Sequence, residues 1–270
     1  MVNPLTRGND RVKDAAKLSR RSQRSERRLF LADGPKAVEG ALSADGCVVE
    51  VFATEAATTA YADLAAAAPR WTLVEPRALE ALSASVTPAG VVAVCRFVDR
   101  PLADALDPRP DLVVVCAHVR DPGNAGTVIR TADAAGAGAV VLAGTSVDAY
   151  NAKTVRATVG SLFHLPLAVV ADPAEAVRSA RSAGLTVLAA DGAGEVDLDQ
   201  ADELLSRPSA WLFGNEAHGL PADLGALADH RVRIPIHGRA ESLNLSTAAA
   251  VCLYASARAQ RQRPGLRLDG

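Results

Sequence analysis

The chain has 270 residues, of which 49% are hydrophobic and 22% charged, and its formal net charge is −2. This composition is typical of a globular protein and excludes a chain that is disordered throughout. No apolar run approaches the roughly eighteen residues that a transmembrane helix needs, and the polar, basic N-terminus does not resemble a signal peptide. We therefore expect a cytoplasmic protein with no membrane partner.

The first thirty residues are basic and have a helical pattern, with Leu18 as their clearest apolar anchor. Nine lysines and arginines lie between Arg7 and Arg28, against three acidic residues. Basic ends on a near-neutral body suit a polyanionic partner, although a solvated helix face explains the same pattern. The C-terminal tail adds further cations at Arg258, Arg261, Arg263 and Arg267.

The next segment predicts a small α/β unit. We expect helices at residues 35–42 and 56–67, and strands at residues 47–53, 71–74 and 90–97. Residues 98–110 then hold three prolines among charged residues, a composition typical of a linker. We therefore divide the chain into an N-terminal domain at residues 1–97, a linker at 98–110 and a second domain at 111–270.

The second domain shows a stronger alternation of strands and helices. The expected strands are uninterrupted apolar runs at residues 112–119, 139–143, 167–170, 185–189, 210–213 and 230–236. The expected helices lie at residues 127–135, 152–163, 174–183 and 246–259. This alternation indicates a parallel sheet covered on both faces, in which ligands bind beyond the carboxyl ends of the strands.

The four cysteines are far apart in the sequence, at Cys47, Cys95, Cys116 and Cys252. None forms a C-x-x-C pair, and the five histidines have no ligand spacing, so we expect no metal site. Three of the cysteines lie in apolar runs and are expected to be buried thiols in a reducing compartment.

One loop after the first strand of this domain carries residues that packing alone does not explain. It runs from Arg120 to Arg130, with a tight turn and a helix start near Ala125 whose free N–H groups suit a phosphate. An ordinary turn capped by Asn124 is the structural alternative. Arg130 lies in the first turns of this helix, where its charge opposes the helix dipole, so we expect an anionic ligand to offset it.

Two later loops also follow predicted strands. In the first, Gly214 and Gly219 bracket polar residues and allow a ligand to approach the backbone closely. The second offers Ser242, Asn244 and Ser246, one of which is expected to cap the last helix. Each loop taken alone could be an exposed connection. Three such loops at strand ends of one sheet predict a shared pocket.

These three loops resemble the motifs of the SpoU/TrmH-type RNA 2′-O-methyltransferases of the SPOUT superfamily. Asp121–Arg130 resembles the first motif, Phe213–Glu216 with Gly219 the second, and Ile234–Pro235 with Glu241–Asn244 the third. Residues 148–166 match another family segment, and order and spacing agree over about residues 111–257. Residues 11–34 resemble the family's substrate-binding domain more loosely.

The resemblance implies an α/β fold with a parallel sheet and a deep trefoil knot in the C-terminal domain, beside a smaller N-terminal α/β substrate-binding domain. It also implies S-adenosylmethionine as cofactor and a homodimer with sites near the subunit interface. The implied catalytic residues are Arg130, Asn124, Glu216, Ser242 and Asn244. The implied cofactor-binding residues are Gly214, Ile234 and Leu243, through backbone groups, with Leu212, Ile236 and Leu245 as apolar neighbours. The expected contacts with RNA phosphates are Arg11, Lys13, Lys17, Arg20, Arg21 and Arg24.

The resulting expectation is an enzyme that methylates a ribose 2′-hydroxyl in RNA, with ribosomal RNA favoured over transfer RNA. A non-catalytic RNA-binding protein on the same scaffold is the alternative, and loss of Asn124, Arg130 or Asn244 would favour it. A nucleotide enzyme of the Rossmann type needs G-x-G-x-x-G after the first strand, which the turn at residues 120–126 lacks.

Overall fold

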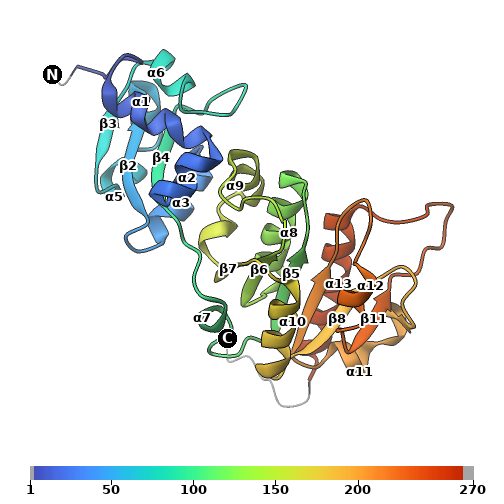
Figure 1. Ribbon diagram of the computed structural model, residues 1–270. Coiled ribbons are helices and arrows are strands. Elements are labelled where there is room, and N and C mark those ends of the chain that lie inside the picture. The colour runs from blue at the N-terminus through green and yellow to red at the C-terminus, as the bar shows by residue number, and fades with distance from the viewer. Residues whose placement is uncertain (1–2, 264–270) are drawn as a thin grey trace. The chain divides into compact units, whose positions relative to one another are not determined.

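The computed structural model describes residues 3–263 and resolves into two compact units (Figure 1). The N-terminal unit takes residues up to 98 together with residues 148–164, and the C-terminal unit takes residues 99–147 and those from 165 onward. Residues 148–164 thus pack with the N-terminal unit, although the sequence groups them with the second domain. Arg267, in the expected basic tail, lies outside the described residues.

The N-terminal unit is a four-stranded sheet in the order β1-β4-β2-β3, with β1 and β2 antiparallel to β4 and β3 parallel to β2. Its strands are β1 Leu29–Asp33, β2 Val48–Ala53, β3 Trp71–Leu73 and β4 Val91–Arg96. Its helices are α1 Asp10–Ala16, α2 Arg21–Arg27, α3 Pro35–Ser43, α4 Glu55–Ala60, α5 Ala62–Ala67, α6 Pro76–Glu80 and α9 Ala152–Thr158. The sequence analysis missed β1 and α6.

Aromatic packing attaches residues 148–164 to the rest of the N-terminal unit. The ring of Tyr150 lies 3.7 Å from that of Phe97 and 4.7 Å from that of Phe30, between centroids. Phe163 stacks on Phe30 with the ring centroids 6.1 Å apart. Gly40 of α3 closes the contact, because a Cβ there would lie only 2.9 Å from the carbonyl oxygen of Gly160.

The C-terminal unit is a seven-stranded, wholly parallel sheet in the order β7-β6-β5-β10-β8-β11-β9. Its strands are β5 Leu112–Ala117, β6 Ala139–Ala143, β7 Leu167–Val170, β8 Thr186–Ala190, β9 Val196–Asp197, β10 Ser209–Phe213 and β11 His230–Arg233. Its helices are α7 Leu102–Ala105, α8 Pro122–Ala135, α10 Pro173–Ser182, α11 Asp202–Leu205, α12 Ala222–Gly225 and α13 Leu245–Arg261. The expected parallel sheet is confirmed.

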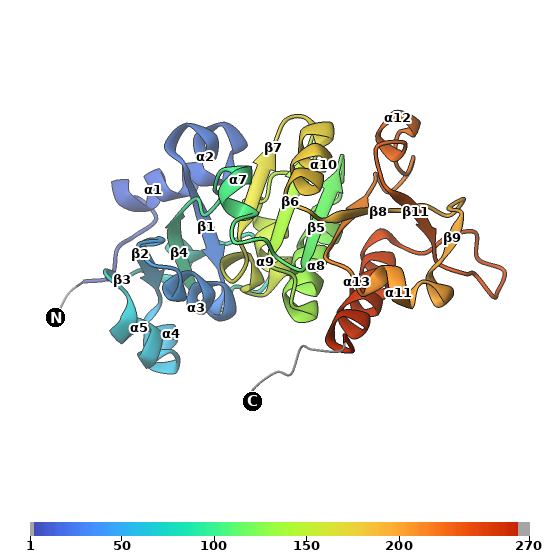
Figure 2. The same ribbon diagram turned by 90° about the horizontal axis from the view of Figure 1, so that it is seen from below.

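Helices cover both faces of this sheet, which explains its uninterrupted apolar strands. In Figure 2, α7, α10 and α12 lie along one face, and α8, α11 and α13 along the other. On the second face Trp211 is fully buried, and its Nε1 donates to Ser256 Oγ of α13 at 2.8 Å. The trefoil knot implied by the resemblance stays a prediction.

Part of the expected linker is structured. Residues 102–105 form α7, and the side chains of Leu102, Ala105 and Leu106 are buried in the same apolar cluster as α10. The prolines at residues 98–110 therefore flank a short helix. This segment is packed against the C-terminal unit and is not the exposed linker that its composition predicts. Within residues 3–263 no helix is long and apolar enough to cross a bilayer.

Arg24 is the most deeply buried cation of the N-terminal unit, at 4% exposure. Its Nη1 donates to the carbonyl oxygens of Leu18 and Ser19 at 2.9 and 2.8 Å, which otherwise end the helical segment before α2 without partners. Its Nε and Nη2 donate to Asp148 Oδ2 at 3.0 and 2.6 Å. The expected phosphate contact by Arg24 does not fit this geometry, because every group that could reach RNA is engaged internally.

We predict that Arg24→Ala lowers the free energy of unfolding by about 3–5 kcal/mol, since it leaves the Asp148 carboxylate and two carbonyls without their donor. The matched control Arg21→Ala removes an exposed arginine and should change stability by no more than about 0.5 kcal/mol. Chemical denaturation monitored by circular dichroism measures both. Equal stability of the two variants would contradict the structural role of Arg24.

Candidate functional site

A cavity of about 360 Å³ lies at the carboxyl ends of β8, β10 and β11. The two later loops of the sequence analysis both line it, as expected for a parallel sheet. Five of the six expected cofactor residues lie in its wall: Gly214, Ile234, Ile236, Leu243 and Leu245. Leu212 does not, because its side chain is fully buried in the apolar cluster under α10, on the opposite side of β10's end.

The loop after β10 closes tightly on itself. Asn215 and Gly219 exchange two backbone hydrogen bonds of 2.9 and 2.8 Å, and Gly219 adopts a φ of +68°. A Cβ at Gly214 would lie 2.3 Å from the carbonyl carbon of Gly219, so only glycine fits there. The backbone of Gly214 is consequently open to the cavity.

Glu216 joins this loop to the turn before α8. Its carboxylate accepts hydrogen bonds from the backbone N–H groups of Arg120 and Asp121, at 3.1 and 3.0 Å, and from Asn124 Nδ2 at 3.3 Å. Partial burial raises the pKa of Glu216, but these donors lower it by more, so the net shift is downward from 4.5. The carboxylate is ionised at neutral pH and fixes the first motif against the second.

Asn244 extends the network to the third motif. Its Nδ2 donates to Asn124 Oδ1 at 3.1 Å, while its Oδ1 caps α13 by accepting from Ser246 N at 2.9 Å. Asn244 is therefore the helix cap that the sequence left undecided. At α8 the cap is Asp121, which accepts from Asn124 N at 2.8 Å, and the helix begins at Pro122, so the expected cap at Asn124 and start near Ala125 are wrong.

The structure brings four of the five expected catalytic residues together. Glu216 and Ser242 line the cavity, Asn124 donates to Glu216, and Asn244 donates to Asn124. Arg130 is the ninth residue of α8 and lies on the exposed side of that helix, six positions and about 9 Å along the axis from Asn124. It does not line the cavity of its own chain, and it lies too far along the helix for the dipole argument to hold.

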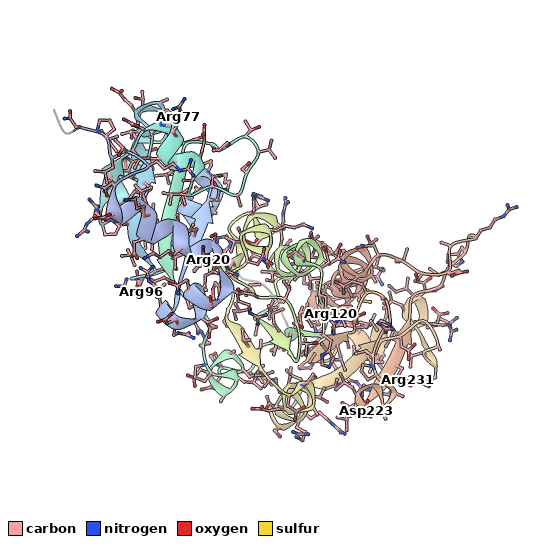
Figure 3. The ribbon with its side chains drawn as sticks, turned by 45° about the horizontal axis from the view of Figure 1, so that its top comes forward. Arg20, Arg77, Arg96, Arg120, Asp223 and Arg231 are labelled. Carbon is pink, nitrogen blue, oxygen red and sulfur yellow. The ribbon has the colours of Figure 1, made fainter. Side chains whose placement is uncertain are left out.

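The residues of the N-terminal unit that are expected to contact RNA fall into two groups, those with an ion pair inside the chain and those without one. Arg11 pairs with Glu50, Lys13 lies 3.4 Å from Asp10, and Lys17 lies 3.3 Å from Asp14. Arg20 (Figure 3) and Arg21 are exposed, and among residues 3–263 no ion pair is found for either. Exposed pairs such as Lys13 with Asp10 are weak and can be exchanged for a phosphate, whereas the Arg24 pair is buried.

The sequence analysis missed one wall of the cavity. Ala190, Asp191 and Gly192, at the carboxyl end of β8, line it between the two expected loops. An Asp-Gly pair directly after an apolar strand was the available signal. Among residues 3–263 no group of three or more histidines, cysteines or carboxylates is placed to hold a metal ion.

Comparison with known proteins identifies the family. Residues 111–254 match the SpoU rRNA Methylase family, and residues 9–93 match the MRM3-like substrate binding domain. The chain belongs to the SpoU rRNA Methylase family.

Individual relatives agree over almost the whole chain. The 23S rRNA (guanosine(2553)-2′-O)-methyltransferase RlmP of Bacillus subtilis is 36% identical over 91% of this chain and 95% of its own. The crystal structure of an AdoMet-bound rRNA methyltransferase from Sinorhizobium meliloti superposes with a TM-score of 0.82 at 35% identity, covering 93% of this chain and 95% of the other. The SpoU methyltransferase AviRb from Streptomyces viridochromogenes, also crystallised with AdoMet, gives 0.81 at 31% identity, with 93% and 98% covered.

We predict that Glu216→Gln lowers the melting temperature at pH 7, because an amide has one acceptor oxygen where the carboxylate serves two backbone N–H groups. The folded-state pKa of Glu216 is lowered, so its stabilising contribution is complete above the ordinary value of 4.5 and is lost as the pH falls through the lowered one. The difference from the wild type should therefore be constant near neutrality and shrink at pH values below 4.5.

Differential scanning fluorimetry across this pH range measures the effect. Glu241→Gln is the matched control, because the Glu241 carboxylate also lines the cavity but accepts no backbone hydrogen bond among the described residues. A melting-temperature difference for Glu216→Gln that persists unchanged into acid would contradict the role of the ionised carboxylate.

Proposed function

We propose that this chain transfers the methyl group of S-adenosylmethionine to a ribose 2′-hydroxyl of ribosomal RNA, in the large subunit. The main support is the hydrogen-bonded chain Glu216–Asn124–Asn244, which unites the three family motifs around one cavity. The relative from Bacillus subtilis is named a 23S rRNA 2′-O-methyltransferase and the structure from Sinorhizobium meliloti an rRNA methyltransferase, which favours ribosomal over transfer RNA. Four unpaired cysteines are consistent with a reducing cytoplasm.

The cavity fits this cofactor by size and by charge. Its volume of about 360 Å³ lies in the range of small-molecule sites. Its charged lining groups among the described residues are all carboxylates, on Asp191, Glu216 and Glu241. The cofactor carries a sulfonium, an ammonium and a carboxylate, and is therefore cationic overall. Backbone groups near Gly214, Ile234 and Leu243 would hold the adenosine, with Ile236 and Leu245 against its apolar faces.

A sulfonium supplies a methyl group that is already activated, so the protein's task is alignment and charge control. Holding the acceptor oxygen about 3–3.5 Å from the methyl carbon can supply most of the acceleration. Asn124 would orient the ribose, while Ser242 and Asn244 would position the nucleotide. A guanidinium keeps its proton in proteins, so we assign Arg130 to stabilising the developing alkoxide and gripping the adjacent phosphate bidentately, rather than to base catalysis.

Arg130 reaches a cavity in this proposal only through a second copy of the chain. On α13 the exposed positions Thr247, Val251, Tyr254, Arg258 and Arg261 follow a spacing of three and four residues and form one stripe. Val251 and Tyr254 in this stripe are 38% and 53% exposed. Because α13 packs beside α8, a homodimer through these helices would cover Val251 and Tyr254 and carry Arg130 toward the partner's site.

The N-terminal unit would recognise the RNA. Arg20 and Arg21 can meet phosphates without breaking an internal ion pair, so binding should weaken as salt rises. The match to a substrate binding domain over residues 9–93 supports this division of roles. RNA recognition of this kind favours single-stranded or distorted elements, whose sugars are accessible.

We predict that Arg130→Lys reduces kcat for rRNA methylation by about a hundredfold or more, since lysine cannot supply the paired donors of a guanidinium. Affinity for S-adenosylmethionine should be unchanged. The assay is methyl transfer to large-subunit rRNA, with ribose methylation mapped along the RNA. The control Arg207→Lys alters an exposed arginine paired with Glu203, away from the cavity. Turnover of Arg130→Lys equal to this control would remove Arg130 from the reaction.

We predict that Tyr254→Glu converts a dimer into a monomer and abolishes methylation, because it places charges in the centre of the proposed interface. Light scattering coupled to size exclusion measures the mass of the particle. Val169→Glu is the matched control, since Val169 is 55% exposed in the same unit but on β7, away from α13. A wild-type protein that is monomeric at the assay concentration and still active would contradict the proposed dimer.

A further inference from the structure

A carboxylate at the end of β8 borders the cavity and has no role in the three family motifs. β8 lies between β10 and β11 in the sheet, so its carboxyl end stands between the two backbone segments at Gly214 and Ile234 that would hold the cofactor's adenosine. Asp191 is the first residue after that strand and lines the cavity. Its side chain is 32% exposed.

Asp191 is held in a defined orientation. Its backbone N–H donates to the carbonyl oxygen of Val232 at 3.0 Å, and Gly194 N donates back to Asp191's own carbonyl at 2.9 Å. One carboxylate oxygen, Oδ1, accepts from Ala193 N at 2.9 Å. The other, Oδ2, lies 3.7 Å from Arg231 Nη1, which attracts it electrostatically but is too far for a hydrogen bond.

Arg231 holds the segment from the side away from the cofactor cavity. It belongs to β11 (Figure 3) and lines a separate cavity of about 400 Å³, which Asp191 also borders. Its Nε donates to Glu195 Oε2 at 3.1 Å, and its backbone N–H to Glu195 Oε1 at 3.0 Å. A Cβ at Gly194 would lie 2.6 Å from the carbonyl oxygen of Arg231, so the turn is packed directly on β11. These contacts hold the turn against β11.

We propose that Asp191 is a further cofactor-binding residue, whose carboxylate accepts hydrogen bonds from the ribose hydroxyls of S-adenosylmethionine. The inference rests on the proposed function and adds a contact to it. A carboxylate is an acceptor-only group and suits a pair of adjacent hydroxyl donors, as acidic residues beside parallel strands do for other nucleosides. Oδ1 of Asp191 already accepts from Ala193 N, whereas Oδ2 accepts no hydrogen bond among the described residues, so Oδ2 is the acceptor that remains for the hydroxyls.

Isothermal titration calorimetry with two ligands tests the contact directly. The ligands are S-adenosylhomocysteine, which retains the ribose, and its 2′-deoxy analogue. Asp191→Asn keeps an oxygen to accept from Ala193 N, so the turn is preserved, but its second oxygen becomes a donor. We expect this variant to bind S-adenosylhomocysteine about tenfold to a hundredfold more weakly than the wild type.

The two ligands together separate a direct contact from a loosened loop. The wild type should lose affinity when the hydroxyl is removed, whereas Asp191→Asn should bind both ligands within about twofold of each other, since the partner of that hydroxyl is already gone. Asp199→Asn, at an exposed position outside the cavity, is the control and should behave as the wild type.

Two other results would overturn the assignment. Asp191 does not contact the ribose if Asp191→Asn binds S-adenosylhomocysteine as tightly as the wild type does. The same conclusion follows if the variant loses as much affinity as the wild type when the 2′-hydroxyl is removed. Neither result contradicts the proposed function. If the wild type binds neither S-adenosylmethionine nor S-adenosylhomocysteine, the proposed cofactor is wrong and the Asp191 contact falls with it.

Discussion

The candidate site depends on one ionised carboxylate that ties two loops together. Glu216 comes from the loop after β10, and its hydrogen-bond donors come from the turn before α8, almost a hundred residues earlier. Each of those backbone N–H groups would otherwise be an unpaired donor at a helix start. Glu216 orients Asn124 by a hydrogen bond, and Asn124 in turn accepts a hydrogen bond from Asn244. A change at the Glu216 side chain therefore affects all three motifs.

The sheet explains why such a network can form. β5 and β10 are adjacent and parallel, so their carboxyl ends meet at one edge and the loops that follow them are neighbours. β8 and β11 continue the same edge and supply the remaining walls of the cavity. The buried strands hold this edge in place, and Gly214 keeps the loop backbone close enough to serve as a binding surface.

Most strands of the second domain and the convergence of its loops could be predicted from the sequence, because strands covered on both faces consist of uninterrupted apolar runs. The two-residue strand β9, Val196–Asp197, lies in none of the expected strands. Other features depend on contacts that no local pattern encodes. Arg24 and Arg21 are the same residue type in one basic segment, yet only the fold shows that Arg24 is buried against Asp148. Asp191 follows its strand without belonging to any of the three motifs, so its place in the cavity wall becomes visible only in the fold. The position of Arg130 relative to the cavity depends on the residue at which α8 begins.

The aromatic contacts of Tyr150 and Phe163 have a consequence for how this architecture can be recombined. The chain passes between the two units three times, near residues 98, 147 and 164, so the substrate-binding part is not a simple N-terminal module. A graft that exchanges only the first 98 residues between relatives would pair foreign rings with the native Tyr150 and Phe163. An exchange of the whole N-terminal unit therefore requires moving residues 148–164 as well.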